Sequence, residues 1–312
     1  MALLFGYHMP RFTFPDTPDE GLFDRVAELA CAAEASGLDL ITVMDHFYQI
    51  PGVGSEEEPM LEAYSTLAAL ATRTSRVRLA TLVTGVTYRN PALLAKTVTT
   101  LDVISGGRAM LGIGAAWNQS EHEGYGFDFP PIGERMDRLD EALTICKLMF
   151  TEERPSFEGK HYRIHSALNS PRPVQRGGPR ILVGGGGERR TLRLVARHAD
   201  MSHWFPSPIE ELRRKTRVLE QHCEAEGRDP STILRMIGAP VLLVENEQQA
   251  GAALERIPPE RRAVLTPATP EQAAERLREY VHAGFQGFTF NNPVLPTAEA
   301  LGLAGELIRL LR

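Results

Sequence analysis

The chain has 312 residues, with 34 lysines and arginines against 40 aspartates and glutamates, a formal net charge of −6 at pH 7. This mildly acidic balance argues against a nucleic-acid-binding protein, whose contact surface would be basic. No apolar stretch approaches the roughly 18 residues that a membrane-spanning helix needs. The three cysteines are widely spaced and form no C-x-x-C pair, so neither a disulfide framework nor a Cys-rich zinc site is indicated. Residues 1–11 lack a basic region followed by a long apolar run, and we expect no signal peptide and a cytoplasmic protein.

Short apolar runs alternate with longer amphipathic stretches along the chain, which is typical of βα units around a parallel sheet. Strands are predicted at residues 3–8, 40–44, 77–84, 108–114, 180–183, 200–204, 236–244 and 285–291. Helices are predicted at residues 19–36, 60–74, 91–104, 134–150, 189–198, 208–226, 271–283 and 299–311.

Eight consecutive βα units favour a closed (β/α)8 barrel, the TIM barrel of the α/β class, over an open doubly wound sheet. A segment rich in proline and glycine, about 151–180, precedes the fifth strand and is predicted to be a loop excursion with a small hairpin near 157–164. We expect one domain over residues 1–312. In this fold the site lies at the C-terminal ends of the strands.

Polar residues follow the second strand. Asp45 and His46 come directly after Leu-Ile-Thr-Val-Met, which places them at the barrel mouth. A histidine there can move a proton near neutral pH. The alternative is a structural Asp–His pair that bonds a loop. His8, at the end of the first strand, is placed to touch a substrate or to serve its loop.

The third and fourth strands are followed by small and polar residues. Thr84-Gly85-Val86 closes the third strand, where a glycine lets backbone approach a ligand closely. Gly112-Ile113-Gly114 leads to Trp117 and Asn118, a flat ring and an amide that both donates and accepts. Glu121 and His122 follow and can titrate. The alternatives are an ordinary βα turn and a loop whose tryptophan fills a gap in the core.

A run of glycines follows the fifth strand. Gly184 to Gly187 lies between a strand and a helix, so its backbone N–H groups form a cradle for a phosphate, with Arg189 or Arg190 adding charge. The alternative is a flexible turn. The nine histidines show no H-E-x-x-H or similar spacing, and no metal site is indicated.

Taken together, these motifs resemble those of the luciferase-like monooxygenase superfamily of flavin and deazaflavin enzymes, and most closely its coenzyme F420-dependent oxidoreductases. The resemblance rests on motifs spread over nearly the whole chain: Asp45-His46, Thr84-Gly85-Val86, Gly112-x-Gly114-Ala115-x-Trp117-Asn118, Glu121-His122 and Gly184-Gly185-Gly186-Gly187. It implies an F420-dependent oxidoreductase, with FMN as the alternative cofactor of an oxygen-using monooxygenase, and a homodimer. A non-catalytic cofactor carrier is a further alternative.

The resemblance also implies roles for individual residues. The cofactor set it implies is Asp45, Thr84, Gly85, Val86, Trp117, Asn118, Gly185, Gly186, Gly187 and Arg190. In relatives the ring stacks on a bulge after the third strand, often with a non-proline cis peptide, which we place at Thr84-Gly85-Val86. Asn118 corresponds to a ring-contacting asparagine, and His46 to the histidine over the reacting carbon in the sugar-phosphate dehydrogenases.

One departure from the resemblance bears on the substrate. In the sugar-phosphate branch a glutamate follows the second glycine of the fourth-strand motif, and here that position is Ala115. We therefore do not expect glucose 6-phosphate oxidation, and Glu121 or His122 is the candidate substitute proton donor. The expected reaction is hydride transfer between F420 and a small organic substrate at the barrel mouth, with His46, Glu121 and His122 as the catalytic candidates.

Overall fold

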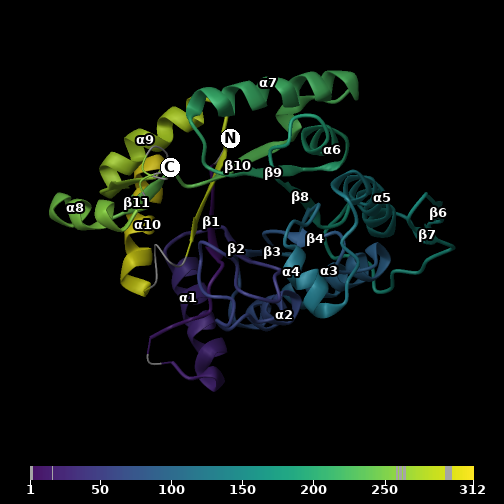
Figure 1. The fold of residues 1–312 in the computed structure, drawn as a ribbon, viewed down its shortest axis with the longest axis horizontal. Coiled ribbons are helices and arrows are strands. Elements are labelled where there is room, and N and C mark those ends of the chain that lie inside the picture. Colours follow the sequence, from purple (N-terminus) through teal and green to yellow (C-terminus); the bar gives the residue numbers. More distant parts are fainter. Residues whose placement is uncertain (1–2, 16, 258, 260–261, 263–264, 292–296) are drawn as a thin grey trace.

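The computed structural model describes residues 3–15, 17–257, 259, 262, 265–291 and 297–312, and it shows a barrel of parallel strands surrounded by helices (Figure 1). The sheet has the order β3-β2-β1-β13-β10-β9-β8-β5-β4. Its strands are β1 (Leu4–Met9), β2 (Leu40–Val43), β3 (Arg78–Thr81), β4 (Thr84–Gly85), β5 (Met110–Gly114), β8 (Arg180–Gly184), β9 (Met201–Trp204), β10 (Leu234–Gly238) and β13 (Gly287–Asn291).

The sheet closes between β3 and β5. A parallel bridge joins Leu79 to Ala109, and the Leu79 N–H donates to the Arg108 carbonyl at 3.0 Å. The strand β4 continues the path of β3 after a break and pairs with β5. The expected α/β barrel is thus confirmed, with its third strand in two pieces.

Helices follow most strands and cover the outside of the barrel. They are α1 (Leu22–Ala35), α2 (Ala63–Arg73), α3 (Pro91–Ser105), α4 (Gln119–Tyr125), α5 (Ile132–Thr151), α6 (Thr191–His198), α7 (Ile209–Ala225), α8 (Glu247–Arg256), α9 (Pro270–His282) and α10 (Ala298–Leu311), with short 3-10 turns at Asp19–Gly21 and Pro230–Thr232. No helix among the described residues is both long and apolar enough to cross a bilayer.

Several other elements differ from the sequence prediction. The predicted strand at 236–244 is two strands, because Pro240 lacks an N–H and interrupts the ladder. Its second half, β11 (Val241–Leu243), pairs with β12 (Thr266–Ala268) outside the barrel. The helices α4 and α8 were not predicted. The hairpin of the excursion is present, as β6 (Phe157–Glu158) and β7 (Arg163–Ile164), and it lies at the periphery (Figure 1).

The barrel interior changes character along its axis. A fully buried apolar cluster fills it lower down, formed by Leu40, Ala80, Met110, Leu182, Met201 and Met236. Two residues further along, five of the six corresponding positions hold Thr42, Gly112, Gly184, His203 and Gly238, and the sixth, after Ala80, holds Leu82. Side chains alternate faces along a strand, so these small and polar residues also face inward. Space and polar groups are therefore concentrated at the C-terminal ends of the strands.

Candidate functional site

A buried carboxylate holds His46 at the strand ends. Glu121, on α4, is fully buried and accepts from His46 Nδ1 at 2.8 Å. It also accepts from the Phe47 N–H at 2.7 Å and the Tyr88 hydroxyl at 2.6 Å. Burial raises the pKa of Glu121, but these hydrogen bonds, led by that of His46, outweigh it and bring the pKa below its ordinary value. Glu121 is therefore an anion at neutral pH.

This contact determines the state of the His46 ring. A carboxylate only accepts hydrogen bonds, so Nδ1 carries a proton and Nε2 of the neutral ring is free to accept one. The His46 side chain is 13% exposed, and no hydrogen bond among the described residues uses its Nε2. Glu121 itself has no exposed surface. It is therefore placed to orient His46 and not to contact a ligand.

Trp117 is displayed beside His46. Its side chain is 56% exposed, and the two rings meet edge to face with centroids 5.5 Å apart. The preceding Ala116 has a φ of 61°, which few residues other than glycine adopt. The buried Arg135 guanidinium donates to the carbonyls of Ala115 and Ala116 and so holds this turn.

Asn118 and His122 are tied to the loop that carries them. The Asn118 side-chain oxygen accepts from the Ser120 hydroxyl at 2.9 Å, and its backbone carbonyl lies 2.6 Å from His122 Nδ1. His122 Nε2 lies 2.6 Å from the Thr87 hydroxyl, and the ring is fully buried. Both nitrogens of His122 are thus occupied within the protein. This arrangement suits a structural role better than proton transfer to a ligand.

Asp45 is engaged by an arginine. It is buried and makes a two-pronged ion pair with Arg89, at 2.5 and 3.0 Å. Burial raises the pKa of Asp45, and Arg89 acts in the opposite direction. Arg89 also pairs with Glu62 at 2.7 Å and lies over the Tyr64 ring, 4.7 Å from its centroid. Asp45 therefore holds the Arg89 guanidinium in place at the rim of the barrel.

The bulge lies two residues before its predicted place. The non-proline cis peptide joins Leu82 to Val83, between the end of β3 at Thr81 and the start of β4 at Thr84. Thr84, Gly85 and Val86 are buried, and the Thr84 hydroxyl lies 2.7 Å from that of Tyr64. Leu82 and Val83 are half-buried and pack onto the interior apolar cluster. The accessible bulge is Leu82–Val83.

Glycines on the facing strands make room for this bulge. A Cβ at Gly114 would lie 3.0 Å from a Val83 methyl group, and one at Gly184 would lie 2.9 Å from it. A Cβ at Gly112 would lie 1.9 Å from the Thr81 carbonyl oxygen, a distance that no side chain tolerates. Sequence reasoning missed Leu82 and Val83. The signal that could have found them is the pair of inward-facing glycines on β5 with another on β8.

The glycine loop lies at the start of α6. Gly185 has a φ of +108° and its N–H donates to the His203 carbonyl at 3.0 Å. The N–H groups of Gly186 and Gly187 have no acceptor among the described residues. A Cβ at Gly186 would lie 3.5 Å from the Lys215 amine, which extends from α7 and pairs with Glu211.

Arg190 points elsewhere. It forms an ion pair with Asp137 on α5 and donates to the Gly133 carbonyl at 2.8 Å. Lys215, in contrast, lies beside the glycine loop. Nothing in the sequence distinguished it from its neighbours Arg213 and Arg214 on the same helix.

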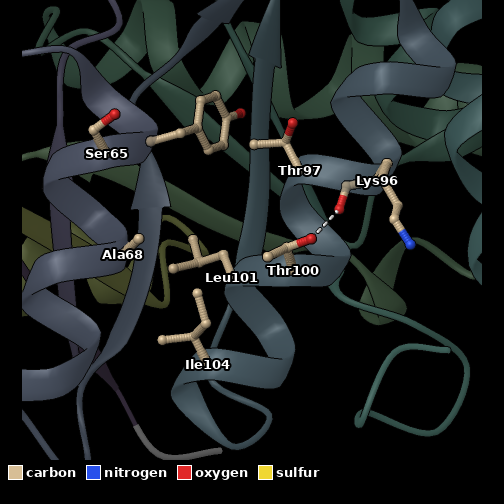
Figure 2. Close-up of a pocket in the computed structure, with 8 residues that line it drawn as sticks. Ser65, Ala68, Lys96, Thr97, Thr100, Leu101 and Ile104 are labelled. Carbon is tan, nitrogen blue, oxygen red and sulfur yellow. Dashed lines mark hydrogen bonds between the residues drawn. The ribbon is translucent and has the colours of Figure 1, made fainter. Parts of the chain in front are cut away.

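A separate hollow of about 310 Å³ lies between α2 and α3 (Figure 2). Figure 2 shows Ser65 and Ala68 on one side and Thr97 and Thr100 on the other, with Ile104 at one end. None of the predicted site residues lines it. Among the described residues, no group of three or more histidine, cysteine, aspartate or glutamate side chains is placed to hold a metal ion.

Known proteins are similar to this chain in sequence and in fold. Residues 4–287 match the family model of the luciferase-like monooxygenases. Over 300 residues the chain is 32% identical to an F420-dependent glucose-6-phosphate dehydrogenase of Intrasporangium calvum, a match that covers 84% of this chain and 86% of that protein.

Two solved structures illustrate the shared fold. An F420-dependent secondary alcohol dehydrogenase in complex with an F420-acetone adduct has a TM-score of 0.82 and 18% identity, and all of both chains is covered. The monooxygenase RslO1 from Streptomyces bottropensis has a TM-score of 0.76 and 22% identity, with 97% of this chain and 98% of that chain covered.

Proposed function

Because the chain belongs to the luciferase-like monooxygenase family, in its F420-dependent oxidoreductase branch, we propose that it transfers a hydride between F420 and a small organic substrate at the C-terminal mouth of the barrel. The observation that carries this proposal is the buried Glu121 carboxylate, which holds His46 by Nδ1 and leaves Nε2 free. This is the arrangement of a general base.

The residues present fit the cofactor in two places. The half-buried bulge Leu82–Val83, which faces the glycines of β5 and β8, offers an apolar surface for a flat ring, with Trp117 exposed nearby. The free N–H groups of Gly186 and Gly187, with Lys215 beside them, offer donors and a positive charge for an anionic tail. When bound, F420 supplies a deazaflavin carbon, C5, that gives or accepts a hydride.

His46 accepts or donates the proton that is transferred together with the hydride. In the oxidation of an alcohol, Nε2 takes the hydroxyl proton while the carbon loses its hydride to the cofactor, and a carbonyl compound results. In the reverse direction the imidazolium returns that proton to the carbonyl oxygen. Glu121 stabilises the imidazolium by its negative charge. Glu121 is a positioning residue. We do not include His122 among the catalytic residues, because both of its ring nitrogens are bonded within the protein.

Two binding titrations test this proposal. Purified protein is titrated with F420 and, separately, with FMN, and the fluorescence of each ligand is followed. We expect tight binding of F420 and weak binding of FMN. The reverse result would instead support the alternative of an FMN-dependent monooxygenase, for which oxygen uptake is the next assay. Binding of neither would overturn the cofactor assignments at the glycine loop and the bulge.

We also propose, from the family resemblance, that the enzyme acts as a homodimer in the cytoplasm. Sedimentation velocity of the purified protein tests the first part, since a monomer at micromolar concentration would contradict it.

A further inference from the structure

Two histidines lie on the inner wall of the barrel away from the proposed cofactor contacts. His8 lies on β1 and His203 on β9. In the sheet order, β1, β13, β10 and β9 are consecutive, whereas the bulge lies between β3 and β4 and the glycine loop follows β8. The two imidazoles therefore line the half of the barrel mouth that the cofactor contacts leave open.

Each histidine is oriented by a threonine. His8 Nδ1 lies 2.9 Å from the Thr42 hydroxyl, and His203 Nε2 lies 2.8 Å from the Thr289 hydroxyl. The second nitrogen of each ring, Nε2 of His8 and Nδ1 of His203, has no hydrogen-bond partner among the described residues. Both rings are half-buried, and neither of these two nitrogens is fully buried. Both nitrogens are therefore open to a ligand.

Both rings are uncharged at working pH. Burial lowers the pKa of His8 to about 3 and that of His203 to about 4. His203 and then His46 also lower the pKa of His8, because a charge on either ring would oppose a charge on this one. A threonine hydroxyl can donate to the ring nitrogen that it contacts or accept from it, so either tautomer of the ring is possible. The other nitrogen of each ring can therefore serve as an acceptor or as a donor. Together they offer two adaptable hydrogen bonds and no charge.

We propose that His8 and His203 bind an uncharged oxygen group of the substrate, adjacent to the carbon that reacts at His46. The enzyme then selects neutral hydroxy-carbonyl compounds over those that carry a carboxylate or phosphate at this position. A buried anion needs an opposite charge or several donors, and two neutral imidazoles provide too little. This inference rests on the proposed hydride transfer and specifies its substrate class.

Three methyl ketones of similar size test the proposal with the F420-loaded enzyme. In 3-hydroxybutan-2-one the second oxygen is an uncharged hydroxyl, in pyruvate it is a carboxylate, and in acetone it is absent. With reduced F420 at pH 7, we expect kcat/KM for the hydroxyketone to exceed that for pyruvate about 100-fold or more, the effect of an uncompensated buried charge.

The variants His8→Phe and His203→Phe then separate the roles. Each should raise KM for 3-hydroxybutan-2-one about tenfold, the loss of one hydrogen bond to a buried partner, and leave KM for acetone and the Kd of F420 within twofold. His8→Gln, which keeps a donor and an acceptor, should recover most of the affinity. His282→Phe, at the end of α9 on the outside of the barrel, is the matched control and should change nothing.

Each other outcome contradicts a defined part of the reasoning. A preference for pyruvate, or no reduction of the hydroxyketone although F420 binds, overturns the substrate class. A weaker Kd of F420 in the Phe variants with unchanged KM assigns the two rings to the cofactor and overturns the proposal. If a Phe variant does not fold, Thr42→Val, which releases His8, should raise the same KM about threefold, and an unchanged KM refutes the role of His8. A wild type that does not bind F420 at all refutes the proposed function instead.

Discussion

Replacing Glu121 by glutamine isolates the charge that holds His46. One carboxylate oxygen accepts from two backbone N–H groups, those of Phe47 and Tyr48, and the other accepts from His46 and Tyr88. A glutamine can keep its oxygen on the two amides only if its NH2 group faces His46. Since Nδ1 must then accept, the proton moves to Nε2, and the neutral ring can no longer act as a base.

The magnitude follows from the hydrogen bond that is lost. A hydrogen bond to a charged group contributes about 1.5–3 kcal/mol, which corresponds to roughly 10- to 150-fold in rate, and the unfavourable tautomer adds to it. We expect Glu121→Gln to lower kcat/KM about 100-fold, with the Kd of F420 within twofold. The loss should be the same in both directions of the reaction, because the enzyme does not change the equilibrium constant.

The assay is the steady-state rate followed by the absorbance of oxidised F420, measured over a range of pH. The limb of the pH–rate profile that reports the general base should move to lower pH, since a neutral amide does not stabilise the imidazolium. Glu123→Gln, an exposed glutamate on the same helix, is the matched control. A Glu121→Gln enzyme with kcat/KM within threefold of the wild type and an unmoved pH profile would refute the role given to this carboxylate.

Three further predictions test the site and its frame. His46→Ala should lower turnover about 100-fold or more while F420 still binds, and full turnover at saturating substrate would exclude His46 from proton transfer. Gly112→Ala should destabilise the protein by about 3 kcal/mol or more in urea unfolding, because its Cβ would meet the Thr81 carbonyl at 1.9 Å, whereas Gly133→Ala, with nothing within 4 Å, should not. Burial acts to raise the pKa of Glu34, but backbone amides of the α2–β3 loop bring it down to about 2. The ionised carboxylate therefore stabilises the folded protein fully above pH 4.5, and this contribution is lost as pH falls toward 2. Glu34→Gln should flatten the pH dependence of the free energy of unfolding in that window, and an unchanged slope would contradict this.

The barrel and the position of His46 follow from patterns that are local in sequence. Apolar runs followed by amphipathic stretches define the βα units, and a polar pair directly after a strand, as at His46, must lie at the barrel mouth. The strand breaks, in contrast, depend on single residues such as Pro240, whose effect on the ladder is visible only once the neighbouring strand is known.

The missed parts depend on contacts between distant segments. The helix α4 has no apolar periodicity, because the residues it buries are Glu121 and His122. The bulge at Leu82–Val83 depends on space left by glycines on two other strands. His203 lies in the strand Met-Ser-His-Trp, where only the alternation of faces, read against a known barrel, shows that it points inward.

The apolar cluster inside the barrel also bears on how ligands enter and leave. Its six side chains, Leu40, Ala80, Met110, Leu182, Met201 and Met236, have no exposed surface and seal the lower end beneath the polar layer. The polar layer that holds His8 lies on the other side of this cluster, at the C-terminal ends of the strands, so we expect a ligand to enter and leave there. Substrate and product would then occupy the same place in turn, so each product must leave before the next substrate binds. We therefore expect product to compete with substrate for the same form of the enzyme.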